Sequence, residues 1–175
     1  MSGRTCCTLK NKIRSSLCAL DLRIVLTGAL VCLLLGILSA FAAGGFELYG
    51  TLCLPLSAPD AFIFPVIWSI MYLLIGAASG IVIASRDKCY GVQRRRGLFY
   101  FTVMLMLNLM WAPAFFGCGL FFVGFVMICA MIIFTFFILL CYSNINFISA
   151  ALIFIYWLWL LYAAYLNLAI LFLNC

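Results

Sequence analysis

The chain has no histidine, and none of its ten cysteines belongs to a CxxC pair. These two absences exclude the ligand spacing that is typical of zinc sites, so we predict no metal centre. Only four residues are acidic, and the long apolar runs contain neither paired carboxylates nor a nucleophile beside a base. We therefore predict no catalytic residues and do not expect a hydrolytic or acid–base enzyme.

The composition of the chain is that of a membrane protein. Of its 175 residues, 69% are hydrophobic and 8% are charged. Soluble domains are about 45–50% apolar and about 25% charged, so a soluble domain is excluded. We predict an all-α integral membrane protein.

Five apolar runs are long enough to cross a bilayer, because a crossing requires about 20 apolar residues of helix. The charge-free stretch 98–142 would be roughly twice too long as one helix. It must contain a reversal, which we place at Pro113, Gly117 and Gly119. We thus predict a basic cytoplasmic tail (1–23) and one five-helix membrane domain (24–174), with spans at 24–46, 62–84, 98–116, 119–142 and 147–173. In an alternative interpretation the first span is a signal peptide, cleaved after the triplet "AFA" at 40–42.

The ten basic residues fall in two clusters, one in the N-terminal tail and one in the 85–97 loop. The clusters are Arg4, Lys10, Lys12, Arg14 and Arg23, and Arg86, Lys88, Arg94, Arg95 and Arg96. Lys and Arg beside apolar spans accumulate on the cytoplasmic side, so we predict a cytoplasmic N-terminus and an external C-terminus. This explanation excludes nucleic acid as a partner and leaves membrane lipid, whose anionic headgroups attract such clusters.

The stretch "MLNLMWAPAFFG" (106–117) places polar and aromatic residues inside an apolar run. Asn108, Trp111 and Phe115 are spaced i, i+3 and i+7, so they share one face of a helix. An amide in hydrocarbon is costly without partners, and Asn108 should therefore point into the bundle. The alternative is that Asn108 only bonds a neighbouring helix.

The second and fifth spans carry comparable stripes. Trp68 and Tyr72 lie near one face of the second span, and Trp159, Ala163 and Asn167 lie along one side of the fifth. Three helices thus offer an inward aromatic side chain, which predicts an apolar pocket for a flat, conjugated or sterol-like molecule. The alternative is a structural subunit whose aromatic residues only pack.

Some residues are predicted to shape the helices and not to bind ligand. Gly76 and Gly80 form a small-xxx-small pair that allows close approach of another helix. The predicted structural positions are Pro65, Gly76, Gly80, Pro113 and Gly117.

Three motifs resemble those of the TspO/MBR family, the tryptophan-rich sensory proteins that include the mitochondrial translocator protein. They are "WSIMYLLIG" (68–76), "LNLMWAPAFFG" (107–117) and "WLLYAAYLNLAI" (159–170), which are similar to family patterns in the second, third and fifth helices. Their order and spacing fit as well, so the resemblance covers roughly residues 24–174.

The resemblance implies a five-helix bundle that binds a hydrophobic ligand as a receptor or sensor. The ligand would be a porphyrin such as protoporphyrin IX, or haem, or in some members cholesterol, with no obligatory cofactor. The implied ligand-binding residues are Trp68, Tyr72, Asn108, Trp111, Trp159, Ala163 and Asn167, and the face shared with Asn108 adds Phe115. The resemblance also implies a homodimer, in a bacterial plasma membrane or, in a eukaryote, the mitochondrial outer membrane.

Two other functions stay open at this point. One is a transporter of tetrapyrroles or lipids, and the other is light-dependent porphyrin degradation through Trp68 and Trp159. The chain departs from the family pattern in its first loop, "LCLPLSAPDAF" (52–62), which has no tryptophan, and at Met104, Met127 and Ile155. We therefore expect a more apolar pocket and an altered loop.

Overall fold

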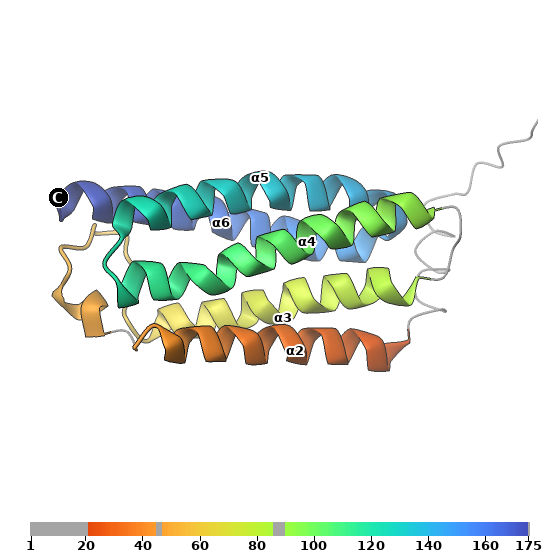
Figure 1. Ribbon diagram of the computed structural model, residues 1–175, viewed down its shortest axis with the longest axis horizontal. Helices are drawn as coiled ribbons and strands as arrows, with labels where there is room; N and C mark the ends of the chain where they lie inside the picture. Colours follow the sequence, from red (N-terminus) through yellow and green to blue (C-terminus); the bar gives the residue numbers. More distant parts are fainter. Residues whose placement is uncertain (1–20, 45–46, 86–89, 175) are drawn as a thin grey trace, which may run out of the picture.

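The computed structural model describes residues 21–44, 47–85 and 90–174. Five long helices make up the bundle (Figure 1): α2 (Leu22–Ala42), α3 (Ile63–Ala84), α4 (Gly91–Ala112), α5 (Phe121–Ile145) and α6 (Phe147–Leu173). A short 3-10 helix, η1 (Glu47–Thr51), follows α2, and a π-helical turn, η3 (Pro113–Gly117), extends α4. All five long helices are apolar and long enough to cross a membrane. The predicted all-α, multi-pass membrane fold is confirmed.

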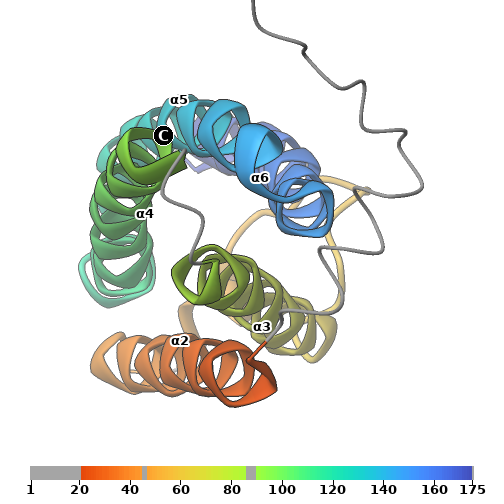
Figure 2. The same cartoon turned by 90° about the vertical axis from the view of Figure 1, so that its right-hand side faces the viewer.

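The helices are arranged in two groups when the bundle is viewed along its length (Figure 2). α2 and α3 lie on one side, and α4, α5 and α6 form an arc opposite them. α2 and α3 cross, so that they diverge toward Ala42 and Ile63.

Glycines bring α2 and α3 together at the other end. A Cβ atom on Gly80 would lie 2.7 Å from the Cα of Val25, and one on Gly76 would overlap the carbonyl oxygen of Gly28. Because the neighbouring atoms are backbone, larger side chains at these two positions would force the helices apart.

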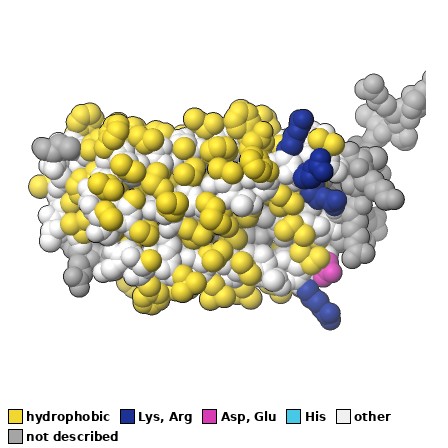
Figure 3. Space-filling view, viewed as in Figure 1, with side chains coloured by type: hydrophobic (Ala, Val, Ile, Leu, Met, Phe, Trp, Pro, Cys, Tyr) yellow, Lys and Arg dark blue, Asp and Glu magenta, His cyan; other side chains and the backbone are white. Residues whose placement is uncertain are grey.

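The outer surface of the bundle is apolar, as lipid contact requires. Leu34, Leu38 and Phe122 are among the large side chains that point outward, and hydrophobic side chains cover the flank shown in Figure 3. The described basic residues gather at one end, where α2 and α4 begin. They are Arg23, Arg94, Arg95 and Arg96.

The start of α4 differs from the prediction. The helix begins at Gly91, seven positions before the expected span, so Arg94, Arg95 and Arg96 lie on a helix and not in a loop. Long basic side chains can cover apolar surface with their stems while their charged groups reach water, so charge did not mark the helix boundary. Arg94 also donates from Nη1 to the carbonyl oxygen of Ser85, 2.5 Å away.

The chain reverses within the predicted segment 113–119, but Pro113 itself does not end the third span. The spanning segment runs from Gly91 to Gly117, since the backbone widens to a π-helical turn at the proline. Such turns accommodate a residue that has no N–H to donate. The chain reverses after the turn, where Gly119 has a φ of +65°, a conformation that favours glycine.

Candidate functional site

A cavity of about 350 Å³ lies between α2, α3 and α4, in the half of the bundle where α2 and α3 diverge. It is lined by Leu33, Gly36, Ile37, Ser39, Ala40, Phe41, Pro65, Trp68, Ser69, Tyr72, Asn108, Trp111 and Ala112. None of these lining residues is charged. A cavity of this size with few polar groups is typical of sites for small apolar ligands.

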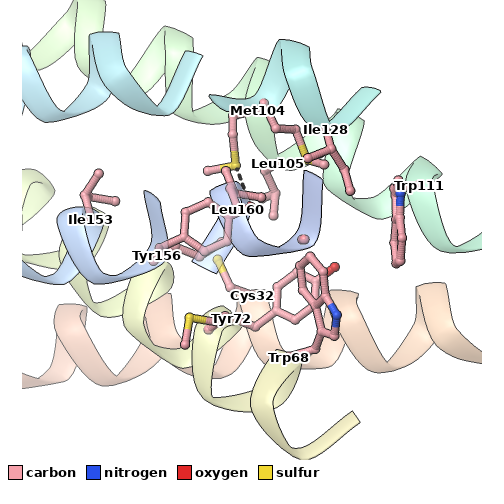
Figure 4. Packing of buried hydrophobic residues seen from close by; sticks show 14 of the residues in the cluster. Cys32, Trp68, Tyr72, Met104, Leu105, Trp111, Ile128, Ile153, Tyr156 and Leu160 are labelled. Carbon is pink, nitrogen blue, oxygen red and sulfur yellow. Dashed lines mark hydrogen bonds between the residues drawn. The ribbon is translucent and has the colours of Figure 1, made fainter. Parts of the chain in front are cut away.

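The cavity brings together four residues that the sequence analysis predicted to bind ligand. Trp68 and Tyr72 come from α3, and Asn108 and Trp111 come from α4. Figure 4 shows Trp68 and Tyr72 beside each other, with Trp111 on the facing helix. The indole rings of Trp68 and Trp111 stack with centroids 5.4 Å apart, and they give the cavity a flat aromatic wall.

The other four predicted residues lie behind this wall and do not line the cavity. Phe115 stacks on Trp111 at 5.1 Å, and Trp159 meets Trp68 edge to face at 6.1 Å. Ala163 and Asn167 line a separate void of about 10 Å³, which is too small for a ligand. These residues therefore support the two tryptophans of the wall.

The sequence analysis missed the wall that α2 provides. Gly36 has no side chain, and the ring of Tyr72 occupies the space that a Cβ atom would take. Ser39, three residues further on, is buried and also lines the cavity. One sequence pattern could have identified this face: the buried residues of α2 are small and repeat every three or four positions in a run of Leu, Ile and Val. They are Ala29, Cys32, Gly36 and Ser39.

Asn108 joins three helices through its amide group. The hydroxyl of Tyr72 on α3 donates to Asn108 Oδ1 at 2.8 Å, and Asn108 Nδ2 donates to the hydroxyl of Tyr156 on α6 at 2.6 Å. The Tyr156 hydroxyl in turn donates to the sulfur of Met104, 3.4 Å away (Figure 4). Asn108 is 1% exposed, so its polar atoms are satisfied mainly by the protein, as buried amides require.

Two tryptophan N–H groups near the cavity have no such partner. The Nε1 atoms of Trp68 and Trp159 are buried and make no hydrogen bond to any described residue. Trp111, by contrast, donates from Nε1 to Asn167 Oδ1 at 3.3 Å. A buried N–H without an acceptor costs about 1–3 kcal/mol. Trp68, which lines the cavity, therefore carries a buried donor that no described residue satisfies.

Three aromatic rings cover the tryptophan wall on the side of the 43–62 loop, and we call Tyr49, Phe64 and Phe116 the aromatic cap. Tyr49 lies 5.7 Å from Phe64 and 6.4 Å from Phe116, measured between ring centroids. Phe64 in turn lies 6.1 Å from Trp68 and 6.2 Å from Trp111. Burial raises the pKa of Tyr49, which is 3% exposed, and Tyr162 and Asp60 raise it further.

Hydrogen bonds hold the loop above the cap against α6. The backbone of Cys53 both donates to and accepts from the Asn174 side chain, at 2.9 and 3.0 Å. Tyr162 donates its hydroxyl to the carbonyl oxygen of Ser57 at 2.6 Å. Within the loop, the Tyr49 hydroxyl donates to the Pro59 carbonyl oxygen at 2.6 Å.

Comparison with known proteins shows which family has this sequence pattern. The model of the TspO/MBR family matches residues 28–173. This chain belongs to the TspO/MBR family. One relative is the tryptophan-rich protein TspO of Chlorobaculum tepidum, which is 33% identical over 126 residues, or 72% of this chain and 78% of the relative. Membership of the TspO/MBR family suggests a role as a membrane sensor or transporter.

Proposed function

We propose that this chain is a membrane receptor or sensor that binds a flat hydrophobic ligand, of the tetrapyrrole type, in the cavity between α2, α3 and α4. The observation that carries the proposal is the stacked pair Trp68 and Trp111, which forms an aromatic wall beside about 350 Å³ of free space. Ring systems stack on such walls, and the free N–H of Trp68 supplies a donor for one acceptor atom. Ligand occupancy, and not catalysis, would carry the signal.

The geometry favours binding over the light-dependent degradation of porphyrin that requires two tryptophans at the ligand. Trp68 lines the cavity, but Trp159 does not. Trp159 lies behind Trp68, and the two rings meet edge to face. The exposed lining residues Ile37 and Phe41 both lie on α2, on the outer flank of the bundle, which favours a binding cavity over a transport path across the membrane.

A titration tests the proposal. Protoporphyrin IX is added to the detergent-purified protein while tryptophan fluorescence is recorded, with the same titration of free tryptophan as the control for absorption by the porphyrin. Saturable quenching is the expected result, because Trp68 and Trp111 would contact the ligand directly. Quenching that rises without saturation, as for free tryptophan, would remove the tetrapyrrole from the proposal.

The placement in the membrane is part of the same proposal. We place the basic end, where α2 and α4 begin, in the cytoplasm of a bacterial plasma membrane, because Arg23 and Arg94–Arg96 gather there. Cys53, exposed on the opposite loop, should then react with a membrane-impermeant maleimide in intact cells. Labelling of Cys53 only after lysis would reverse the orientation. The homodimer rests on the family resemblance, and cross-linking in membranes tests it.

A further inference from the structure

We infer that the ligand is an uncharged molecule dissolved in the bilayer, and that it enters the cavity sideways between α2 and α3. The inference rests on the proposed function, since it concerns how the same cavity is filled. It follows from which sides of the cavity are closed and from the chemistry of the side that is open.

The side between α2 and α4 is closed by a hydrogen bond that depends on Pro113. Ser39 on α2 donates its hydroxyl to the backbone carbonyl oxygen of Leu109 on α4, 2.5 Å away. Leu109 lies four residues before Pro113, which has no N–H, so its usual helical partner is missing. Ser39 therefore satisfies a carbonyl group that the proline leaves free, as serine often does between membrane helices.

The end of the bundle nearest the 43–62 loop is closed as well. The aromatic cap covers the tryptophan wall there, and Tyr49 is buried among these rings. The loop that carries Tyr49 is bonded to α6 through Asn174 and Tyr162. A ligand arriving from the aqueous phase at this end would have to break these contacts.

The remaining side opens between the diverging halves of α2 and α3. Ile37 and Phe41 on α2 line the cavity and are also 40% and 78% exposed. On α3, the half-buried Pro65 and Ser69 line it from the opposite side. These four residues are the lips of the opening.

The surroundings of the lips identify the source of the ligand. Neighbouring side chains that point away from the bundle are apolar, including Leu38 on α2 and Val66 and Ile70 on α3. α3 contains no charged residue and α2 contains none after Arg23. The opening therefore faces hydrocarbon, where a charged molecule is strongly disfavoured. Since no charged residue lines the cavity either, a carboxylate would find no counter-ion inside.

The route is tested by exchange kinetics in phosphatidylcholine nanodiscs. The probe is protoporphyrin IX dimethyl ester, which lacks the two carboxylates, and tryptophan quenching reports its binding and its release into excess empty vesicles. Ile37→Trp and Ser69→Phe each enlarge one lip, and both should slow association and dissociation about tenfold, as obstruction of an access path does. Leu38→Trp is the matched control, because Leu38 neighbours Ile37 but does not line the cavity.

A further variant tests the other route. Tyr162→Phe combined with Tyr165→Phe and Asn174→Ala removes the side-chain hydrogen bonds between the loop and α6 and should leave both rates at the parental values. Faster exchange in this variant, or parental rates in a lip variant that keeps the parental unfolding temperature, would overturn entry between α2 and α3. Ile37→Phe is a smaller change that serves if the tryptophan variant does not fold.

The charge of the ligand has its own readout. The dimethyl ester should bind the parent protein more tightly than protoporphyrin IX does, and tighter binding of the dicarboxylate would overturn the uncharged ligand. If neither porphyrin shows saturable binding, the proposed function itself fails. That outcome differs from one in which both bind but the lip variants have no effect.

Discussion

The indole rings of Trp68 and Trp111 stack with their planes 25° apart, although one belongs to α3 and the other to α4. Trp111 is fixed from behind by its hydrogen bond to Asn167, whereas the N–H of Trp68 has no acceptor among the described residues. The two rings therefore differ in one respect: the donor of Trp111 is satisfied within the protein, whereas that of Trp68 would be satisfied only by an acceptor on the proposed ligand.

The first prediction follows from this difference. Trp68→Phe keeps an aromatic ring in the wall but removes the N–H, and we expect porphyrin binding to weaken about tenfold, the value of one hydrogen bond of roughly 1.4 kcal/mol. Porphyrin absorbance measures the affinity independently of tryptophan fluorescence. Trp157→Phe is the control, because Trp157 donates to the Ile132 carbonyl on the far side of α6. Equal affinities of the two variants would show that Trp68 donates nothing to the ligand.

The second prediction concerns Asn108. Asn108→Leu leaves the Tyr72 hydroxyl without its acceptor and the Tyr156 hydroxyl without a donor, and a buried polar group left unpaired costs about 1–3 kcal/mol. We expect the free energy of unfolding in detergent to fall by about 2 kcal/mol. Asn144→Leu should have little effect, since Asn144 is exposed and bonds only the Leu140 carbonyl of its own helix. An unchanged stability of Asn108→Leu would contradict the network described above.

A third prediction tests the crossing of α2 and α3. In Gly76→Ala the new methyl group would meet the backbone of Gly28 and Ala29, so the helices must separate, and we expect a loss of about 1–3 kcal/mol in unfolding free energy. The same substitution at Gly91 is the control, because no atom lies within 4 Å of the position that its Cβ would occupy. Equal unfolding temperatures for the two variants would mean that the close approach contributes nothing.

The fourth prediction is a dependence on alkaline pH. Burial raises the pKa of Tyr49 above its ordinary value of 10.0, so the folded protein retains this proton at a pH where the unfolded chain releases it. Stability from this group is therefore complete below about pH 10 and declines as pH rises further. The fall in unfolding temperature between about pH 9 and pH 11 should be smaller in Tyr49→Phe than in the parent. All other tyrosines are common to both proteins, so parallel curves would show that Tyr49 titrates as it does in the unfolded chain.

Much of the fold can be predicted from the sequence, because the hydrocarbon of the bilayer restricts which segments can span it and where polar residues can lie. Apolar runs of about 20 residues fix the number of spans, and polar residues within such runs must turn inward. Asn108 illustrates this rule: its helix and its inward direction were both predicted, and so was the face it shares with Trp111. The prediction also left open whether Asn108 only bonds neighbouring helices, and its amide does bond α3 and α6.

The residues that line the cavity could not be predicted in the same way. Spacing along a helix determines which residues share a face, but it does not determine which helix that face meets. Trp159 therefore shares the inward direction of Trp68 and yet lies behind it. On α2 the wall depends on Gly36 and Ser39, whose spacing with other small residues marks a helix face but does not show that this face meets a cavity. The start of α4 was predicted too late in the chain, because charged residues were expected to lie outside the helix.

One hydrogen-bond network joins three helices through Tyr72, Asn108 and Tyr156. The amide of Asn108 accepts from the hydroxyl of Tyr72 and donates to the hydroxyl of Tyr156. No member can be exchanged alone for an apolar residue without stranding a polar atom in the centre of the bundle. The three residues thus act as one unit, and loss of the asparagine alone would leave both tyrosine hydroxyls without their present partner on α4.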